Sequence, residues 1–546
     1  MAGFTIRRFA GKALGLDQSA GAVRYANDAV DVDLSHGTLR PLRLNREVGR
    51  LPNAVGTTTS FMVEDCCAAA GEQCSSFLRL ALPCERYFRV HNGQLQNARS
   101  LCGPWTDLGH PCIKQVPELL TSAVATEGKV IYKQYLYTVV NEFGEIEAVS
   151  PPSNPYVGDW DRESLVFNVE APLAGTSGLG DRVVRLYSTA PDLTMGPDAA
   201  PTDLNFFYVS EIGYGSDTIS HDPKRHPYGD PLLPEDYSPP PRHLTSLAHW
   251  GSRQIAGVAD GELWFSMRGN YAVWPNDARM RFDDAALVFA ASGRLGYVLT
   301  CGRPVVVNLD DDCRDGRCHN ATRIEEPLPL LAPRSVASHD GGVIYASDLG
   351  LVYLNGTRWT MLTAGLSREQ WHAMVPYRMR GVMHRGTYFL ATDAGTWRIH
   401  LPGNPFDPAT GRASLVRLST GVEAWYRTDK GRLLFSPGDQ QVLEWAEGAN
   451  FQTMVWDSDP LEPRSGVRFA YVNASHDARY TISAVPYHKG LPPPGLSLDG
   501  NFYSGPGWVR IPSWIDRGWW TMRVVVDWGE ISEITLSTSR TLKGAR

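Results

Sequence analysis

The chain has 546 residues, of which 43% are hydrophobic and 20% charged, a composition that excludes a disordered protein. Its 52 basic and 59 acidic residues leave a net charge of −7, and no basic tract is dense enough to form a nucleic-acid groove. The 52 glycines and 38 prolines, without long helical periodicity, predict an all-β protein of several domains. We expect neither a signal peptide nor a membrane span, because no long apolar stretch is present.

The first 128 residues are predicted to form an N-terminal β platform. Polar and apolar residues alternate over Ala29–Leu34, as they do in a strand with one buried face, and a turn at Gly37 follows. Beyond this turn Pro41 favours an extended backbone, because its ring disfavours the helical region for the residue before it. A cysteine-rich, loop-rich insertion is expected within residues 50–120.

The nine cysteines are unevenly spread along the chain. They are Cys66, Cys67, Cys74, Cys84, Cys102, Cys112, Cys301, Cys313 and Cys318. Their odd number argues against a complete disulfide framework, and their spacing lacks the paired CxxC knuckles of a zinc site. We expect buried free thiols. Disulfides that form after release from the cell, or a metal site, are the alternatives.

Residues 129–190 are predicted to form a small fibronectin-like β-sandwich, because runs of β-branched and aromatic residues are typical of strands. The predicted strands include Tyr135–Val140, Leu165–Val169 and Val183–Tyr187. Tyr135–Val140 leads into a second predicted stretch over Asn141–Ala148, and the proline pair at 151–152 ends this strand pair, since proline cannot donate a hydrogen bond to a ladder. A stiff connector rich in proline and glycine is expected over residues 191–242.

The most regular pattern is a hairpin repeat in residues 243–450, in which a glycine-led strand, a tight turn and a second strand recur. The leading glycines are Gly261, Gly296, Gly342, Gly386 and Gly431, which gives spacings of 35, 46, 44 and 45 residues. Such spacing predicts a β-propeller-like region, because a single hairpin cannot bury its own apolar face. The turns Ser347–Gly350 and Thr392–Gly395 carry Asp and Gly residues that suit tight hairpins, and a helix-like bridge is expected between them.

Residues 451–546 are predicted to form a C-terminal β unit that is rich in tryptophan. Its four closely spaced tryptophans are Trp508, Trp514, Trp519 and Trp520. Large aromatic side chains are mostly buried, so we expect these in the core, with a rim or an interface as the alternative.

Residues that could carry chemistry are scarce in this sequence. The stretch Asp310–His319 combines carboxylates with Cys and His, but it lacks the alternating ligands and distal Glu of a calcium loop, so we interpret it as a solvated loop. The turns Asp348–Gly350 and Asp393–Gly395 are similar to the Asp-box of sialidase propellers, which is a structural motif. No phosphate loop, nucleophile elbow or HExxH motif is present. We therefore predict no catalytic, cofactor-binding or metal-binding residues, no cofactor and no enzymatic activity.

Several segments carry a resemblance to a known family. They are Ala26–Leu34 with Gly37–Pro41, Tyr135–Glu145 with Ser150–Ser153, Arg185–Thr189, Ile344–Val352, and Leu362–Thr363 with Glu369–Trp371. Taken in order over roughly residues 20–400, they resemble virion proteins of the tail nozzle (tail tubular protein B) class of short-tailed bacteriophages. The cysteine-rich region 66–112 has no counterpart in that pattern.

The resemblance implies a hexameric ring subunit with a propeller, located in the virion below the tail adaptor after assembly in the host cytoplasm. Its partners would be further copies of itself and other tail proteins, such as the adaptor, fibres or tip. Double-stranded DNA would pass through the ring during ejection without sequence-specific binding, and net negative charge would favour passage over adhesion. Contact with the host cell surface is a further expectation.

Two other hypotheses remain open at this stage. Because the chain is shorter than many nozzle proteins, it could be a distal ring or a tail-tip homologue. The first alternative in function is a receptor-binding or glycan-binding tail tip protein that holds a cell-surface glycan on its propeller face, for which a trimer would be typical. The second alternative is a glycan-cleaving propeller enzyme, which would need clustered carboxylates in a central pocket.

Overall fold

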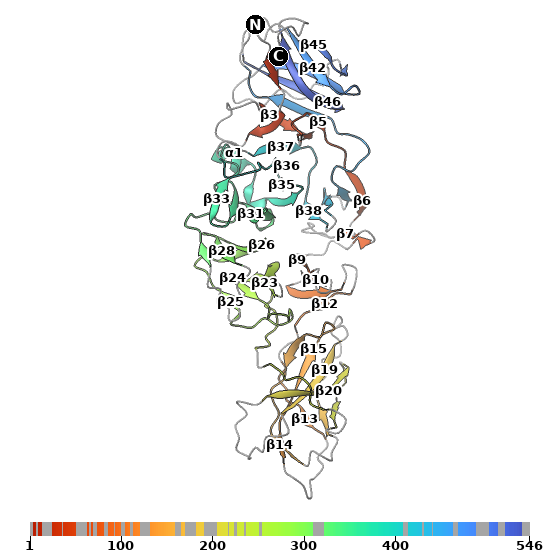
Figure 1. Ribbon diagram of the computed structural model, residues 1–546, viewed down its shortest axis with the longest axis vertical. Helices are drawn as coiled ribbons and strands as arrows, with labels where there is room; N and C mark the ends of the chain where they lie inside the picture. The colour runs from red at the N-terminus through yellow and green to blue at the C-terminus, as the bar shows by residue number, and fades with distance from the viewer. Residues whose placement is uncertain are drawn as a thin grey trace. The chain divides into compact units, whose positions relative to one another are not determined.

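The computed structural model divides the chain into two compact units. Unit 1 comprises Met1–Glu72, Cys301–Pro304 and Ile324–Arg546, and unit 2 comprises Gln73–Thr300 and Val305–Arg323. The described residues are 4–6, 9–13, 24–34, 36–50, 63–64, 67–68, 74–80, 86–91, 93–99, 104–109, 113–120, 131–158, 165–169, 182–189, 205–213, 215–216, 218–222, 227–233, 236–250, 254–308, 321–407, 413–428, 431–438, 441–461, 468–486, 502–511 and 519–537. Within these ranges the regular elements are β-strands, apart from one α-helix, α1 (Arg368–Ala373), and two short 3-10 helices, η2 (Pro333–Ser335) and η3 (Pro376–Arg378) (Figure 1).

Unit 2 contains a β-sandwich with a single hydrophobic core. One sheet has the order β16-β15-β19-β20 and the other the order β13-β18-β21. Their strands are β13 (Glu118–Leu119), β15 (Tyr135–Val140), β16 (Ile146–Val149), β18 (Leu165–Asn168), β19 (Val183–Thr189), β20 (Phe206–Gly213) and β21 (Thr218–His221), beside which β14 (Ile131–Lys133) pairs with β17 (Tyr156–Gly158). Alternate residues of β15, among them Tyr135 and Tyr137, enter the core, where the Tyr135 ring lies 4.3 Å from that of Phe167. The residues that alternate with these in β15 point to the opposite face of the sheet, away from this core.

Unit 2 also contains three four-stranded antiparallel sheets in which strands adjacent in sequence are neighbours, as in propeller blades. Their strands are β9 (Cys74–Leu80), β10 (Arg86–His91), β11 (Gln94–Ala98) and β12 (Thr106–Asp107), then β22 (Thr245–Trp250), β23 (Gln254–Ala259), β24 (Glu262–Phe265) and β25 (Arg279–Met280), then β26 (Ala286–Ser292), β27 (Leu295–Thr300), β28 (Val305–Asn308) and β29 (Thr322–Arg323). Asp260 and Gly261 both have positive φ, 52° and 76°, as the turn between β23 and β24 requires. Two apolar clusters join the middle sheet to the sheets before and after it.

Unit 1 carries three more antiparallel groups of four strands, of which the first and third are separate sheets and the second forms one end of a ten-stranded sheet. Their strands are β30 (Ala337–His339), β31 (Gly342–Ala346), β32 (Leu351–Asn355) and β33 (Arg358–Met361), then β34 (Arg380–His384), β35 (Thr387–Thr392), β36 (Gly395–His400) and β37 (Ser414–Leu418), then β38 (Ala424–Arg427), β39 (Leu433–Ser436), β40 (Gln441–Glu444) and β6 (Arg46–Arg50). The last sheet is completed by β6, a strand from far earlier in the chain (orange-red in Figure 1). Between the first two sheets lies α1, which begins with a capping box between Ser367 and Gln370 and buries Trp371.

The two ends of the described chain share one core in unit 1. The strands are β1 (Phe4–Ile6), β2 (Phe9–Ala13), β3 (Arg24–Val30), β41 (Met454–Ser458), β42 (Phe469–Ala474), β43 (Arg479–Pro486), β44 (Tyr503–Ser504), β45 (Gly507–Arg510), β46 (Trp520–Trp528) and β47 (Ile531–Ser537). Unit 1 also contains two short strand pairs, β4 (Val32–Asp33) with β5 (Arg40–Pro41) and β7 (Val63–Glu64) with β8 (Cys67–Ala68). Strand β1 pairs with β47, and β3 pairs with β41. The sequence predicts an N-terminal platform and a separate C-terminal unit, whereas these ladders join the two ends because each supplies strands that the other lacks.

The predicted fold class is confirmed: the chain is all-β and multi-domain, with propeller-like sheets and β-sandwich modules. The predicted hairpin at Gly342 corresponds to β31 and β32, and that at Gly386 to β35 and β36. The C-terminal tryptophans differ in exposure: Trp520 is buried, whereas Trp519 is half exposed. Trp514 lies outside the described residues. No helix in the described ranges has the length and apolar character needed to cross a membrane.

Candidate functional site

The two Asp-containing turns that the sequence singled out are braced by arginines. Asp348 accepts a hydrogen bond from Arg368 at 3.2 Å, and Asp393 accepts one from Arg378 at 2.5 Å. The carboxylates are about two-fifths exposed and the arginines more so. The Asp348 turn is thereby tied to the helix α1 that follows it, and the Asp393 turn to a segment that precedes it, which is a structural use of these residues.

Other candidates from the sequence lie outside the described residues or apart from any cluster. Asp310–His319 falls outside them, as do Cys66, Cys84, Cys102 and Cys112. The prediction of buried free thiols is wrong for Cys301, which is a free thiol but is exposed. In the part of the chain that the structure describes, no three His, Cys, Asp or Glu side chains meet as a metal site would need.

Unit 2 contains a network of two buried ion pairs, which we call the joint. Arg86 of β10 donates to Glu145 through both terminal nitrogens, at 2.7 and 2.8 Å, and both side chains are less than one-tenth exposed. The Arg86 guanidinium also lies 3.8 Å from the ring centre of Phe143. Such a bidentate, stacked arginine is held in one orientation.

The second ion pair of the joint is buried still more completely. Arg182, just before β19, donates to Glu147 at 2.6 Å, and the two side chains are 2% and 0% exposed. Arg182 also donates to the backbone oxygen of Asp107 in β12, at 2.6 Å. The Asn141 amide donates to Glu145 at 3.0 Å and to Glu147 at 3.4 Å, so it links the two pairs.

The joint connects three sheets of unit 2. Glu145 and Glu147 belong to the sandwich, Arg86 and Asp107 to the β9–β12 sheet, and the loop after β24 contributes the backbone N–H of Tyr271, which donates to Glu145 at 3.1 Å. Both carboxylates are fully engaged, so the arrangement holds modules in register rather than offering a free acid or base. The signal in the sequence is two acidic residues flanking Ile146 at the start of a strand, and it was not among the predicted sites.

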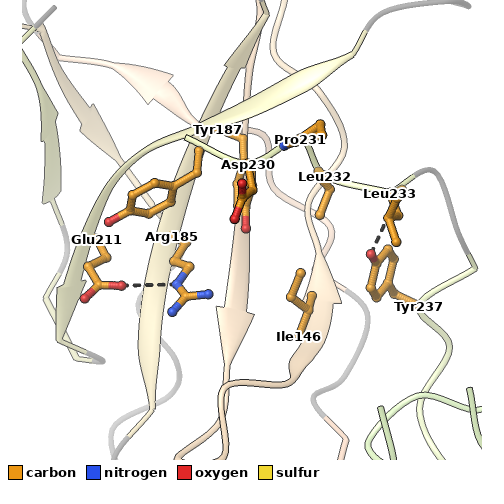
Figure 2. A pocket seen from close by; sticks show the side chains of 10 residues that line it. Ile146, Arg185, Tyr187, Glu211, Asp230, Pro231, Leu232, Leu233 and Tyr237 are labelled. Atoms are coloured by element: carbon orange, nitrogen blue, oxygen red, sulfur yellow. Dashed lines mark hydrogen bonds and ion pairs between the residues drawn. The ribbon is translucent and has the colours of Figure 1, made fainter. Parts of the chain in front are cut away.

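The outward face of the sheet β16-β15-β19-β20 carries a pocket of about 450 Å³ (Figure 2). Its lining residues are Ile146, Arg185, Tyr187, Tyr208, Glu211, Asp230, Pro231, Leu232, Leu233 and Tyr237. Arg185 pairs with Thr138 and Glu211 across neighbouring strands, which places their side chains on the face opposite the sandwich core. None of these residues was predicted from sequence to belong to a site.

One wall of this pocket is a segment that runs along the edge of β20, residues 227–233, which we call the strap. Its backbone pairs with β20 as a strand would: the N–H of Tyr208 donates to Asp230 at 3.1 Å, and that of Leu232 to Phe206 at 2.7 Å. The strap thus occupies the edge of β20, and its residues Asp230–Leu233 face Arg185 and Tyr187 across the pocket (Figure 2).

Unit 1 contains a buried histidine, His384, and a half-buried one, His400, whose pKa values are both affected by the half-buried Arg398. Burial, followed by the charges of nearby arginines, lowers the pKa of His384 to about 4. Burial, followed by the charge of Arg398, lowers the pKa of His400 to about 4. Arg398 is held by Asp33 at 3.4 Å. Both imidazoles are therefore uncharged at neutral pH, and His384 Nδ1 and His400 Nε2 have no hydrogen-bond partner among the described residues.

Comparison with known proteins identifies no family for this chain. No family model matches it, and no curated protein matches it. Solved structures that it resembles include the WD40 domain of Neurospora crassa Pan2 (9% identity, TM-score 0.25, covering 60% of this chain and 89% of that one) and the WD40 β-propeller of Doa1 (8%, 0.29, 74% and 98%). Another is PorZ of Porphyromonas gingivalis, a component of a type-IX secretion system (10%, 0.26, 83% and 78%). At these TM-scores the similarity carries no argument about what this chain does.

Proposed function

We propose that this chain is a structural subunit of a bacteriophage tail, of the nozzle type, which forms part of a ring around the DNA-ejection channel. The observation that carries the proposal is the joint, because a subunit under mechanical load needs its modules held in register. Two buried ion pairs and their hydrogen bonds supply that link between three sheets of unit 2. The segments that resemble nozzle proteins, in the same order along the chain, are the reason for proposing the nozzle type.

In this role the protein is a virion component without catalytic activity or cofactor. Its partners are five further copies of itself in a hexamer and the neighbouring tail proteins, while double-stranded DNA passes without sequence-specific contacts. The net charge of −7 supports passage, since like charge disfavours adhesion of phosphates.

The test is the mass and symmetry of the purified protein. Native mass spectrometry and negative-stain imaging should give a six-fold ring with an open axis. A monomer at every concentration, both alone and with a tail adaptor protein added, would contradict the ring.

A second candidate function is binding of a receptor or glycan by a tail tip protein. The observation that favours it is the pocket on the outward face of the sandwich, which brings aromatic and charged side chains together. A trimer in the same measurement would favour this candidate over the ring.

A further inference from the structure

The pocket on the sandwich combines two kinds of surface that are seldom placed together on an outward sheet face. Three tyrosines and two leucines provide apolar and aromatic walls, while Arg185, Glu211 and Asp230 provide charged groups. Figure 2 shows Arg185, Glu211 and Tyr187 on one side, Leu233 and Tyr237 on the other, and Asp230 between them. Pockets that orient a small ligand have this composition, a mainly apolar lining with a few convergent polar groups.

The polar groups remain available to a ligand. Arg185 donates to Glu211 at 3.1 Å, but their side chains are 33% and 47% exposed, so both have hydrogen-bonding positions open to solvent. The Asp230 carboxylate is exposed and makes no hydrogen bond or ion pair with other side chains among the described residues. A guanidinium and carboxylates can each bridge two neighbouring hydroxyl groups of a ligand.

The aromatic rings lie beside these charged groups. The rings of Tyr187 and Tyr208 are 6.0 Å apart at 75°, and the Arg185 guanidinium is 5.8 Å from the Tyr208 ring centre. The faces of aromatic rings carry partial negative charge, so they attract the weakly positive C–H groups on one side of a sugar ring. A sugar offers this combination of a C–H face and a rim of hydroxyls.

The charge of the pocket and the backbone pairing of the strap limit the class of ligand that the pocket can bind. One arginine and two carboxylates line the pocket, so its net charge is negative and it disfavours phosphates, nucleotides and acidic sugars. An extended peptide could not add to the edge of β20 as a strand there, because the strap already pairs with it. A volume of about 450 Å³ lies in the lower part of the usual range for ligand pockets, roughly 300–1,000 Å³.

We propose that this pocket binds a neutral saccharide of one or two rings. Tyr208 and Tyr237 contact the C–H face of the sugar, while Asp230 and the Arg185–Glu211 pair bind its hydroxyls. The proposal stands independently of ring assembly, since every lining residue belongs to one sandwich, to its strap or, for Tyr237, to the segment that follows the strap.

The test uses the full chain and saturation-transfer difference NMR with glucose, galactose, N-acetylglucosamine, lactose and cellobiose, and with sialyllactose as the anionic probe. We expect saturation transfer to at least one neutral sugar and none to sialyllactose. Titration of the bound sugar should show at least a tenfold weaker affinity for Tyr208→Ala and for Asp230→Asn. Tyr377→Ala, which removes a tyrosine that is 64% exposed in unit 1, is the matched control and should bind as the wild type does.

Several results would overturn the proposal. One is the absence of transfer to any neutral sugar, and another is transfer to sialyllactose alone. Equal binding by the wild type and Asp230→Asn would also do so. Asp230→Asn is not expected to disturb folding, because that carboxylate is exposed and binds no other side chain among the described residues. A loss of binding by this variant can therefore be assigned to the pocket, and circular dichroism checks the fold of each variant. The state of assembly in the same samples, read by native mass spectrometry, separates a failed pocket from a failed ring.

Discussion

Two Arg–Glu pairs of the same sandwich, whose arginines lie three residues apart in sequence, have different surroundings. Arg182–Glu147 is 2% and 0% exposed and joins the sandwich to another sheet, whereas Arg185–Glu211 is 33% and 47% exposed and lines a pocket. Both are Arg–Glu ion pairs, so it is burial that distinguishes the pair that holds two sheets together from the pair that lines a pocket. A buried charge that loses its partner is costly, while an exposed one is rehydrated by water.

The largest effect is expected for the buried pair. Glu147→Ala leaves the Arg182 guanidinium buried without its carboxylate, and we expect a loss of about 3–5 kcal/mol in the free energy of unfolding. Urea denaturation followed by tryptophan fluorescence measures it. The double variant Arg182→Met/Glu147→Leu is the control: it removes both charges and should recover much of the loss. A single variant as stable as the wild type would show that the joint does not hold the modules.

A medium effect is expected from His384 and His400 of unit 1, which are ionisable groups without a counter-charge of their own. Their folded pKa of about 4 lies below the usual 6.5, so the folded state binds fewer protons than the unfolded state. The resulting stability is present above pH 6.5 and is lost as the pH falls through 4. For each histidine we expect this loss to be about 2–3 kcal/mol, because its pKa falls from 6.5 in the unfolded state to about 4 in the folded state.

Urea denaturation at pH 7 and pH 4 measures this effect. His400→Gln should lose less stability between these two pH values than the wild type does. His372→Gln, which replaces an exposed histidine of α1, should behave as the wild type. Parallel losses in all three proteins would show that His400 does not titrate on unfolding.

The smallest effect is expected for the exposed pair. Glu211→Ala should change the free energy of unfolding by about 0–1 kcal/mol, because solvent-exposed ion pairs contribute little. The same urea series measures it, with Glu147→Ala as the matched comparison. If both variants lost equal stability, burial would not be what distinguishes the two pairs.

Local features of the fold were predictable from sequence, and non-local ones were not. The glycine-led hairpins around Gly342 and Gly386 follow from turn chemistry that acts over a few residues. The pairing of β3 with β41 depends on segments at opposite ends of the chain, for which local patterns carry no signal. The sandwich strands β15 and β19 lie where runs of β-branched and aromatic residues predicted them.

The candidate site was harder to predict than the fold. Glu145 and Glu147 flank Ile146 in a run that was identified as a strand, but their arginines come from residues 86 and 182. The pocket unites a residue of β16 with the strap more than eighty residues later. Such sites arise from packing between elements, so the residue types alone could not assign them.

The pairing of the chain's two ends has a consequence for synthesis. Trp456 of β41 donates to the backbone of Ala10 in β2, and these residues are 446 positions apart. At a translation rate of about 5–20 residues per second, β2 is synthesised roughly 20–90 s before its partner β41. The strands of unit 2 emerge within that interval, so they can fold while the first strands of unit 1 are still exposed and open to capture by a chaperone or by another nascent chain.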